Sequence, residues 1–236
     1  MSALFIGVIL FLVAPRAVSA QGLERWVSRS FWSQLKQGKI SGDIRYRFET
    51  FERDGAKFTA PAYASTLRLA LGYETPRFHD FSVFAQGVAV FLTGPADYSV
   101  PSLRSQNRPD RPAILDPRSV QLSQGYLKWA RGFQNRKLAL TVGREEIVLN
   151  DGRFISSSYW RQVHGSFDAA QLDADLSRDV SFTYAFLNRQ YRVDGPEATD
   201  GQPPMHTHML DLTWRKPGQV NVSAYGLLVD YRSPAQ

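Results

Sequence analysis

The chain has 236 residues, of which 43% are hydrophobic and 21% are charged, a composition that excludes an intrinsically disordered protein. It contains no cysteine, which excludes disulfide-stapled scaffolds and thiolate metal sites. Its 28 lysines and arginines exceed its 22 aspartates and glutamates, but the two signs are interleaved along the chain. Nucleic-acid-binding proteins usually gather their bases on one face, so the pattern argues against a nucleic-acid partner.

Residues 1–20 are predicted to be a secretory signal peptide. Residues 4–13 form an apolar run, Pro15 interrupts it, and Val18-Ser19-Ala20 offers the small residues that a signal peptidase accepts. The run is about half of the roughly 20 residues that a membrane-spanning helix needs. We therefore expect an exported protein in which residues 21–39 form a short periplasmic segment.

From residue 40 onward, apolar residues recur at every second position, the period of a β-strand. In residues 40–49, for example, Ile44, Tyr46 and Phe48 alternate with Arg45 and Arg47. The same alternation predicts nine strands, near residues 40–49, 63–75, 80–92, 120–131, 136–149, 163–176, 179–190, 206–215 and 219–230. The sequence therefore predicts an all-β protein.

The connections between these strands alternate in length. Those at 50–62, 93–119, 150–162 and 191–205 are long, whereas those at 76–79, 132–135, 177–178 and 216–218 are short. Outer-membrane barrels combine tight periplasmic turns with long extracellular loops, while a soluble periplasmic β-sandwich binding protein, the alternative fold, has no reason to sort its loops in this way. We therefore expect residues 40–236 to form an antiparallel transmembrane β-barrel in the bacterial outer membrane.

The predicted strand number is odd, whereas bacterial single-chain barrels have an even number of strands. The final residues, "YRSPAQ", also lack the terminal aromatic residue on which such barrels usually end. We therefore expect these strands to be the N-terminal part of a larger barrel.

A barrel in lipid points apolar side chains outward and polar side chains toward its aqueous lumen, because a charge facing hydrocarbon costs about 2–4 kcal/mol at the midplane. The outward residues are predicted to include Leu67, Leu69, Leu71, Phe182, Tyr184, Phe186, Leu210, Leu212 and Trp214. The predicted lumenal bases are Arg45, Arg47, Arg68, Lys128, Arg144, Arg189 and Arg215. Lumenal acids equal them in number: Asp43, Glu49, Glu74, Glu146, Asp173, Asp175 and Asp211.

Alternation slips from even to odd positions between Val142 and Ile147, which predicts a β-bulge near residues 143–145 that re-aims Arg144 and Glu146. The loop at 150–162 is long enough to fold back into the lumen. There Arg153 and Arg161 would form a constriction suited to carboxylates and sugar hydroxyls. The alternative is an external loop whose arginines pair with Asp151 and Glu145.

Other combinations of polar residues do not predict a metal site or a catalytic site. His206 and His208 have a spacing that can chelate a metal, but no carboxylate lies near them before Asp211, so we predict no metal site and no cofactor. Glu145 and Glu146 are adjacent strand residues that point to opposite faces, so they cannot act as a catalytic pair. Since no nucleophile elbow or phosphate-binding loop is present, we do not expect an enzyme.

Residues 143–173 contain four short motifs: Gly143-Arg144, Asn150-Asp151-Gly152-Arg153-Phe154, Trp160-Arg161-Gln162 and Phe167-Asp168-Ala169. With these motifs the segment resembles the alginate export family of outer-membrane porins, and the resemblance extends more weakly over residues 40–190. The chain departs from the family pattern at Glu145 and at Val163-His164-Gly165.

This resemblance implies a porin or exporter through which saccharides or other small polar solutes diffuse across the outer membrane without a chemical step. An outer-membrane hydrolase with its site at the extracellular rim and a structural barrel that transports nothing are the alternatives within the same fold. The balanced lumenal charges favour a pore for neutral or mixed solutes over a dedicated channel for a polyanion.

Overall fold

The computed structural model describes residues 35–55, 57–216 and 220–231. The chain divides into two units, residues 1–37 and 38–236, of which the first is described only for residues 35–37. The predicted signal peptide and residues 21–34 of the predicted periplasmic segment lie outside the described residues. The account below therefore concerns the second unit.

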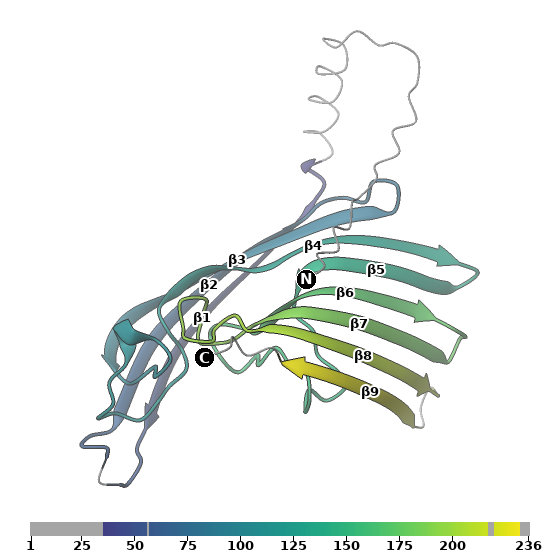
Figure 1. The fold of residues 1–236 in the computed structure, drawn as a ribbon. Helices are drawn as coiled ribbons and strands as arrows, with labels where there is room; N and C mark the ends of the chain where they lie inside the picture. Colours follow the sequence, from purple (N-terminus) through teal and green to yellow (C-terminus); the bar gives the residue numbers. More distant parts are fainter. Residues whose placement is uncertain (1–34, 56, 217–219, 232–236) are drawn as a thin grey trace, which may run out of the picture. The chain divides into compact units, whose positions relative to one another are not determined.

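The second unit is one antiparallel sheet in which nine strands lie side by side in chain order (Figure 1). The strands are β1 (Lys39–Phe51), β2 (Ala62–Glu74), β3 (Phe81–Asp97), β4 (Ser119–Phe133), β5 (Arg136–Glu145), β6 (Ser166–Asp175), β7 (Val180–Tyr191), β8 (Pro204–Arg215) and β9 (Asn221–Tyr231). A short 3₁₀ helix, η1 (Arg104–Gln106), lies in the β3–β4 loop. The predicted all-β antiparallel fold is confirmed. Among the described residues, no helix is long and apolar enough to cross a membrane.

The predicted alternation of long and short connections is also confirmed. Residues 75–80, 134–135, 176–179 and 216–220 form the short connections, and residues 52–61, 98–118, 146–165 and 192–203 form the long ones. The β4–β5 turn has both of its residues, Gln134 and Asn135, at positive φ (45° and 66°). A two-residue turn of this kind matches the right-handed twist of the flanking strands, so it holds them in a tight hairpin.

The two faces of the sheet differ in what they contact. On one face, which we call the covered face, residues such as Arg68, Val90 and Ala139 are buried. On the other, which we call the bare face, large apolar side chains remain exposed: Ile44 by 76% and Leu71 by 66%. The strand register places the predicted outward residues on the bare face: Leu67, Leu69, Leu71, Phe182, Tyr184, Phe186, Leu210, Leu212 and Trp214.

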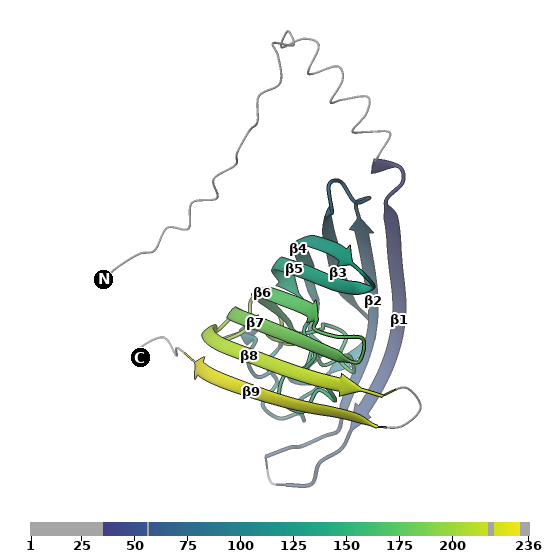
Figure 2. The same cartoon turned by 90° about the vertical axis from the view of Figure 1, so that its right-hand side faces the viewer.

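Residues 146–165, here called the infolded segment, pack against the covered face at two distant places. Ile147 and Leu149 lie in a hydrophobic cluster with Leu187 of β7 and Met209 of β8. Val163 lies in another, with Val90 of β3. A single segment reaches both clusters because the sheet curves around it, as Figures 1 and 2 show for the strands. The covered face is therefore the inner side of a curved sheet.

The infolded segment also explains why two predicted strands are too long. The structure ends β5 at Glu145 rather than residue 149, and it begins β6 at Ser166 rather than residue 163. Ile147 and Leu149 alternate with polar or exposed neighbours because their side chains pack into the hydrophobic cluster, although they lie outside any strand. Periodicity alone does not distinguish these two causes.

The predicted β-bulge at residues 143–145 is wrong. The β4–β5 register runs to Arg144 and the β5–β6 register runs to Glu145, both without a shift, and the apparent slip arises because the strand ends after Glu145. Register shifts occur instead between β2 and β3, β3 and β4, β6 and β7, and β7 and β8. Gly143 nevertheless has a φ of +136°, and a Cβ there would clash with the carbonyl oxygen of Gly125. This position therefore requires glycine.

Candidate functional site

Three of the predicted site residues lie together on the covered face of β1 and β2. Arg45 is directly opposite Arg68 across the strand pair, and Arg47 follows Arg45 on the same face of β1. Two like charges in this position repel one another unless counterions are close. Asp43 supplies one counterion by forming an ion pair with Arg68, whose side chain is only 4% exposed. We call Arg45, Arg47 and Arg68 the arginine cluster.

The infolded segment satisfies the donors of the cluster with its own backbone. Arg45 donates from Nη1 to the carbonyl oxygen of Tyr159 at 2.9 Å, and from Nη2 to the carbonyl of Arg161. Arg47 donates to the carbonyl of Trp160 and also lies over the Trp160 ring, 4.5 Å from its centroid. An arginine has five N–H donors in a fixed plane, which allows each side chain to hold several points of the segment at once.

Two buried side chains fix the segment further. Asp116, from the β3–β4 loop, is fully buried and accepts hydrogen bonds from the Gln162 backbone N–H at 2.7 Å and from Arg47 Nη1 at 2.8 Å. Gln162, also fully buried, accepts from Arg45 Nε at 3.0 Å and donates to Thr66 Oγ1 at 2.8 Å. Charge-assisted bonds are the stronger kind of hydrogen bond, so Asp116 and Gln162 anchor the segment on β1 and β2.

The two arginines of the segment have different surroundings. Arg161 lies with the arginine cluster, where Nη1 is 3.5 Å from Glu49 and 4.0 Å from Asp116. Arg153 instead pairs with Asp151 at 2.8 Å, with its side chain 79% exposed. Arg161 therefore lies where the loop folds onto the sheet, as one prediction had it. Arg153 pairs with Asp151, as the alternative had it. Neither arginine pairs with Glu145.

Arg144 and Arg189 lie on the face opposite to the one predicted. Because β5 alternates without a bulge, Arg144 shares the bare face with Val142, and its Nε donates to Asp168 at 3.0 Å. Arg189 pairs with Asp168 in the strand register because an extra residue, Asn188, shifts the alternation of β7. Glu145, not Glu146, is the last covered-face residue of β5.

Lys128 lies on the covered face of β4, as predicted, but away from the arginine cluster. Arg161 lies with the arginine cluster, whereas Lys128 and Arg153 lie apart from it. The sequence analysis missed Asp116 and gave no role to Gln162 or Tyr159, although Gln162 belongs to the Trp160-Arg161-Gln162 motif. Asp116 lies in a long loop, where periodicity carries no signal.

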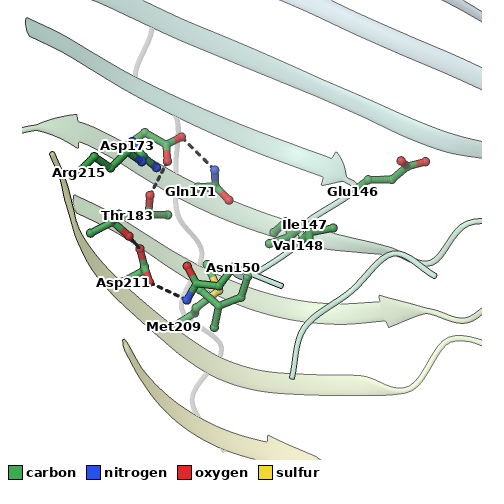
Figure 3. A pocket seen from close by; sticks show the side chains of 12 residues that line it. Glu146, Ile147, Val148, Asn150, Gln171, Asp173, Thr183, Met209, Asp211 and Arg215 are labelled. Carbon is green, nitrogen blue, oxygen red and sulfur yellow. Dashed lines mark hydrogen bonds between the residues drawn. The ribbon is translucent and has the colours of Figure 1, made fainter. Parts of the chain in front are cut away.

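A pocket of about 410 Å³ lies on the covered face where the infolded segment meets β6, β7 and β8 (Figure 3). Asp173 accepts hydrogen bonds from Gln171 at 2.9 Å and from Thr183 at 2.8 Å. Asp211 accepts from Thr213 at 2.6 Å and from Asn150 of the infolded segment at 3.1 Å. These two carboxylates and that of Glu146 outnumber Arg215 in the lining, which gives the pocket an acidic character.

A second pocket, of about 290 Å³, lies beside the arginine cluster. Its lining includes Asp43, Arg45, Arg68 and Glu146, and the ring of Tyr159 forms part of its wall. Burial, and then the nearby Glu146 carboxylate, raise the pKa of Tyr159 above its ordinary value. The phenol therefore remains protonated at neutral pH and keeps its hydrogen-bond donor.

The charges of the covered face are matched locally. In the arginine cluster Asp43 pairs with Arg68 and Asp116 with Arg47, and beside the cluster Glu49 pairs with Arg161. Of the predicted lumenal bases, Arg144 and Arg189 lie on the bare face, and Glu145 is an additional acid on the covered face. The register also places Lys39 and Lys137 on the covered face.

Comparisons with known proteins agree with the fold and the motifs. The model of the alginate export family matches residues 37–232, which include the whole sheet. No curated protein and no solved structure matches the chain. The exposed apolar bare face and the charged covered face are also those of a barrel wall between lipid and water. The chain belongs to the alginate export family, a family of outer-membrane transport proteins and not of enzymes.

Proposed function

We propose that the chain forms part of a diffusion channel that passes saccharides or other small polar solutes, and that it favours neutral solutes over polyanions. The observation that carries this proposal is the infolded segment, which lies on the covered face and is held there by the arginine cluster. A segment held inside a barrel narrows the lumen and brings polar groups close to a passing solute.

The preference for neutral solutes follows from the charges. A channel for a polyanion needs a lumen with net positive charge. Here Arg47, Arg68 and Arg161 each have a carboxylate within 4.0 Å, so most of their field is neutralised. The acidic pocket at Asp173 and Asp211 adds negative charge farther along the same face. A polyanion therefore gains little from this wall, whereas sugar hydroxyls gain many hydrogen-bonding partners.

Single-channel recording in planar bilayers tests the proposal. We expect ion conductance, and a reversal potential near zero in a KCl gradient. An Arg161→Gln variant is expected to change conductance because it alters the inner wall, while Arg153→Gln, with its exposed side chain, serves as the matched control. A strong anion preference would contradict the neutral preference. Absence of conductance together with hydrolysis of a lipid or peptide would instead support an outer-membrane hydrolase.

A further inference from the structure

The pocket of about 290 Å³ beside the arginine cluster contains hydrogen-bonding atoms that the protein leaves unused. Arg68 is 3% exposed, and its Nε has no hydrogen-bond partner among the described residues. His164 Nε2 is likewise buried and without a partner in the described part of the chain. A buried polar atom without a partner is unfavourable, because it has lost its bonds to water and gained no other. Both residues line the pocket, so a ligand there gives these atoms a partner when the Arg68 or His164 side chain turns toward it.

The chemistry of these two atoms specifies the ligand. Arg68 Nε can only donate, whereas His164 Nε2 accepts in the neutral ring, because Nδ1 lies 3.2 Å from Glu146 Oε1 and donates its proton there. A hydroxyl group both donates and accepts, so adjacent hydroxyls match both atoms. Gln86 and Gln124 also line the pocket and are joined only by a long bond of 3.4 Å. Each amide can exchange that bond for one to a hydroxyl.

The pocket also has an aromatic wall. Tyr159 is 51% exposed, and its ring meets the His164 ring edge-on, with the ring centroids 4.9 Å apart. The Tyr159 backbone carbonyl accepts a hydrogen bond from Arg45, which fixes the backbone from which the ring extends. A pyranose presents a flat face of C–H groups, and burying that face against an aromatic ring removes apolar surface from water.

The charges in the pocket balance, with Arg45 and Arg68 facing Asp43 and Glu146. Arg68 and Asp43 form an ion pair, so neither is free to attract a charged ligand strongly. The volume of about 290 Å³ lies just below the roughly 300–1,000 Å³ usual for pockets that hold drug-sized ligands. The pocket therefore fits a small, neutral, hydroxyl-rich ligand.

We propose that this pocket binds one pyranose unit of a neutral saccharide, with the ring stacked on Tyr159 and its hydroxyls bonded to Gln86 and Gln124, and to Arg68 Nε and His164 Nε2 once these two side chains turn toward the ligand. The proposal rests on the proposed function, because it assigns that channel a saccharide-binding step. It adds to that function a defined subsite and the residues that would hold the sugar.

Isothermal titration of the purified full chain in detergent with maltose and cellobiose, and with digalacturonate as the charged counterpart, tests this site. We expect both neutral disaccharides to bind more tightly than digalacturonate. Tyr159→Ala is expected to weaken binding by about tenfold, since roughly 1.4 kcal/mol of stacking and desolvation is lost. Tyr159→Phe is expected to retain most of the affinity because the ring remains.

Tyr225→Ala is the matched control, because Tyr225 is 46% exposed on the same face and contacts Phe154 rather than this pocket. Gln124→Leu provides a second variant with an intact Tyr159, and it is also expected to weaken binding. Equal affinity in Tyr159→Ala and Tyr225→Ala, or preference for digalacturonate, would overturn the site. A chain that conducts ions but binds no neutral sugar would reject the pocket and leave the channel standing. A chain that binds sugar without conducting would reject the channel alone.

Discussion

Asp116 is the residue whose replacement most directly tests whether the infolded segment is anchored on β1 and β2. Its carboxylate is fully buried and lies 2.8 Å from Arg47 Nη1 and 2.7 Å from the Gln162 backbone nitrogen. An Asp116→Asn substitution keeps the size and leaves an oxygen for the Gln162 N–H. It removes the negative charge that Arg47 requires.

The expected magnitude follows from the burial of this ion pair. Breaking a buried pair by removing one partner costs about 3–5 kcal/mol. Arg47 retains the Trp160 carbonyl and a distant Glu49 at 4.0 Å, so the lower end, about 3 kcal/mol, is the better expectation. Since about 1.4 kcal/mol corresponds to a factor of ten, the released population of the segment should rise by roughly 100-fold.

Limited proteolysis with trypsin measures that population. Trypsin cleaves after arginine, and Arg161 is held against Glu49, whereas Arg153 is exposed on the same segment and serves as an internal control. When opening and closing are fast, the cleavage rate follows the population of the open form. Cleavage after Arg161 should accelerate by about 100-fold in Asp116→Asn, while cleavage after Arg153 stays the same. Unchanged cleavage after Arg161, or equal acceleration at both sites, would refute the anchoring role.

Three further predictions concern the sheet and the β3–β4 loop. Ile44 and Asp43 are neighbours on opposite faces, so a spin label at Ile44 should be relaxed by lipid-dissolved oxygen and one at Asp43 by a water-soluble nickel complex. The same environment for both labels would contradict the facing. The absence of native cysteine makes the labelling specific. Gly143→Ala should destabilise the chain by at least about 2 kcal/mol in urea unfolding because of its positive φ and the close strand backbone, while Gly87→Ala, which has open space, should not. Burial raises the pKa of Tyr98, whose hydroxyl donates to a backbone carbonyl at 2.6 Å. The tyrosine therefore ionises first in the unfolded chain, and the free energy of unfolding should fall as the pH rises past about 10. Tyr98→Phe should reduce this dependence of stability on pH.

Many residues of the site could be predicted from the sequence, but their contacts could not. Arg45, Arg47, Arg68 and Lys128 were predicted on one face because a regular strand fixes facing through its period of two. Arg144 and Arg189 were misplaced for different reasons. The alternation near Arg144 was misread because a strand ended, while an extra residue at Asn188 reversed the facing of Arg189. A shift of one residue moves a side chain to the opposite face, so such local features decide facing.

The sequence by itself determined the class of fold, the number of strands and the parity of the loops. These depend on local rules: the alternation of side chains along a strand and the short turns that join adjacent strands. Only the tertiary structure decided where the infolded segment lies and which groups hold it. Asp116 and Gln162 meet Arg47 and Arg45 across separations of 69 and 117 residues. Contacts of that range leave no period in the sequence, because they arise from the curvature of the whole sheet around the segment.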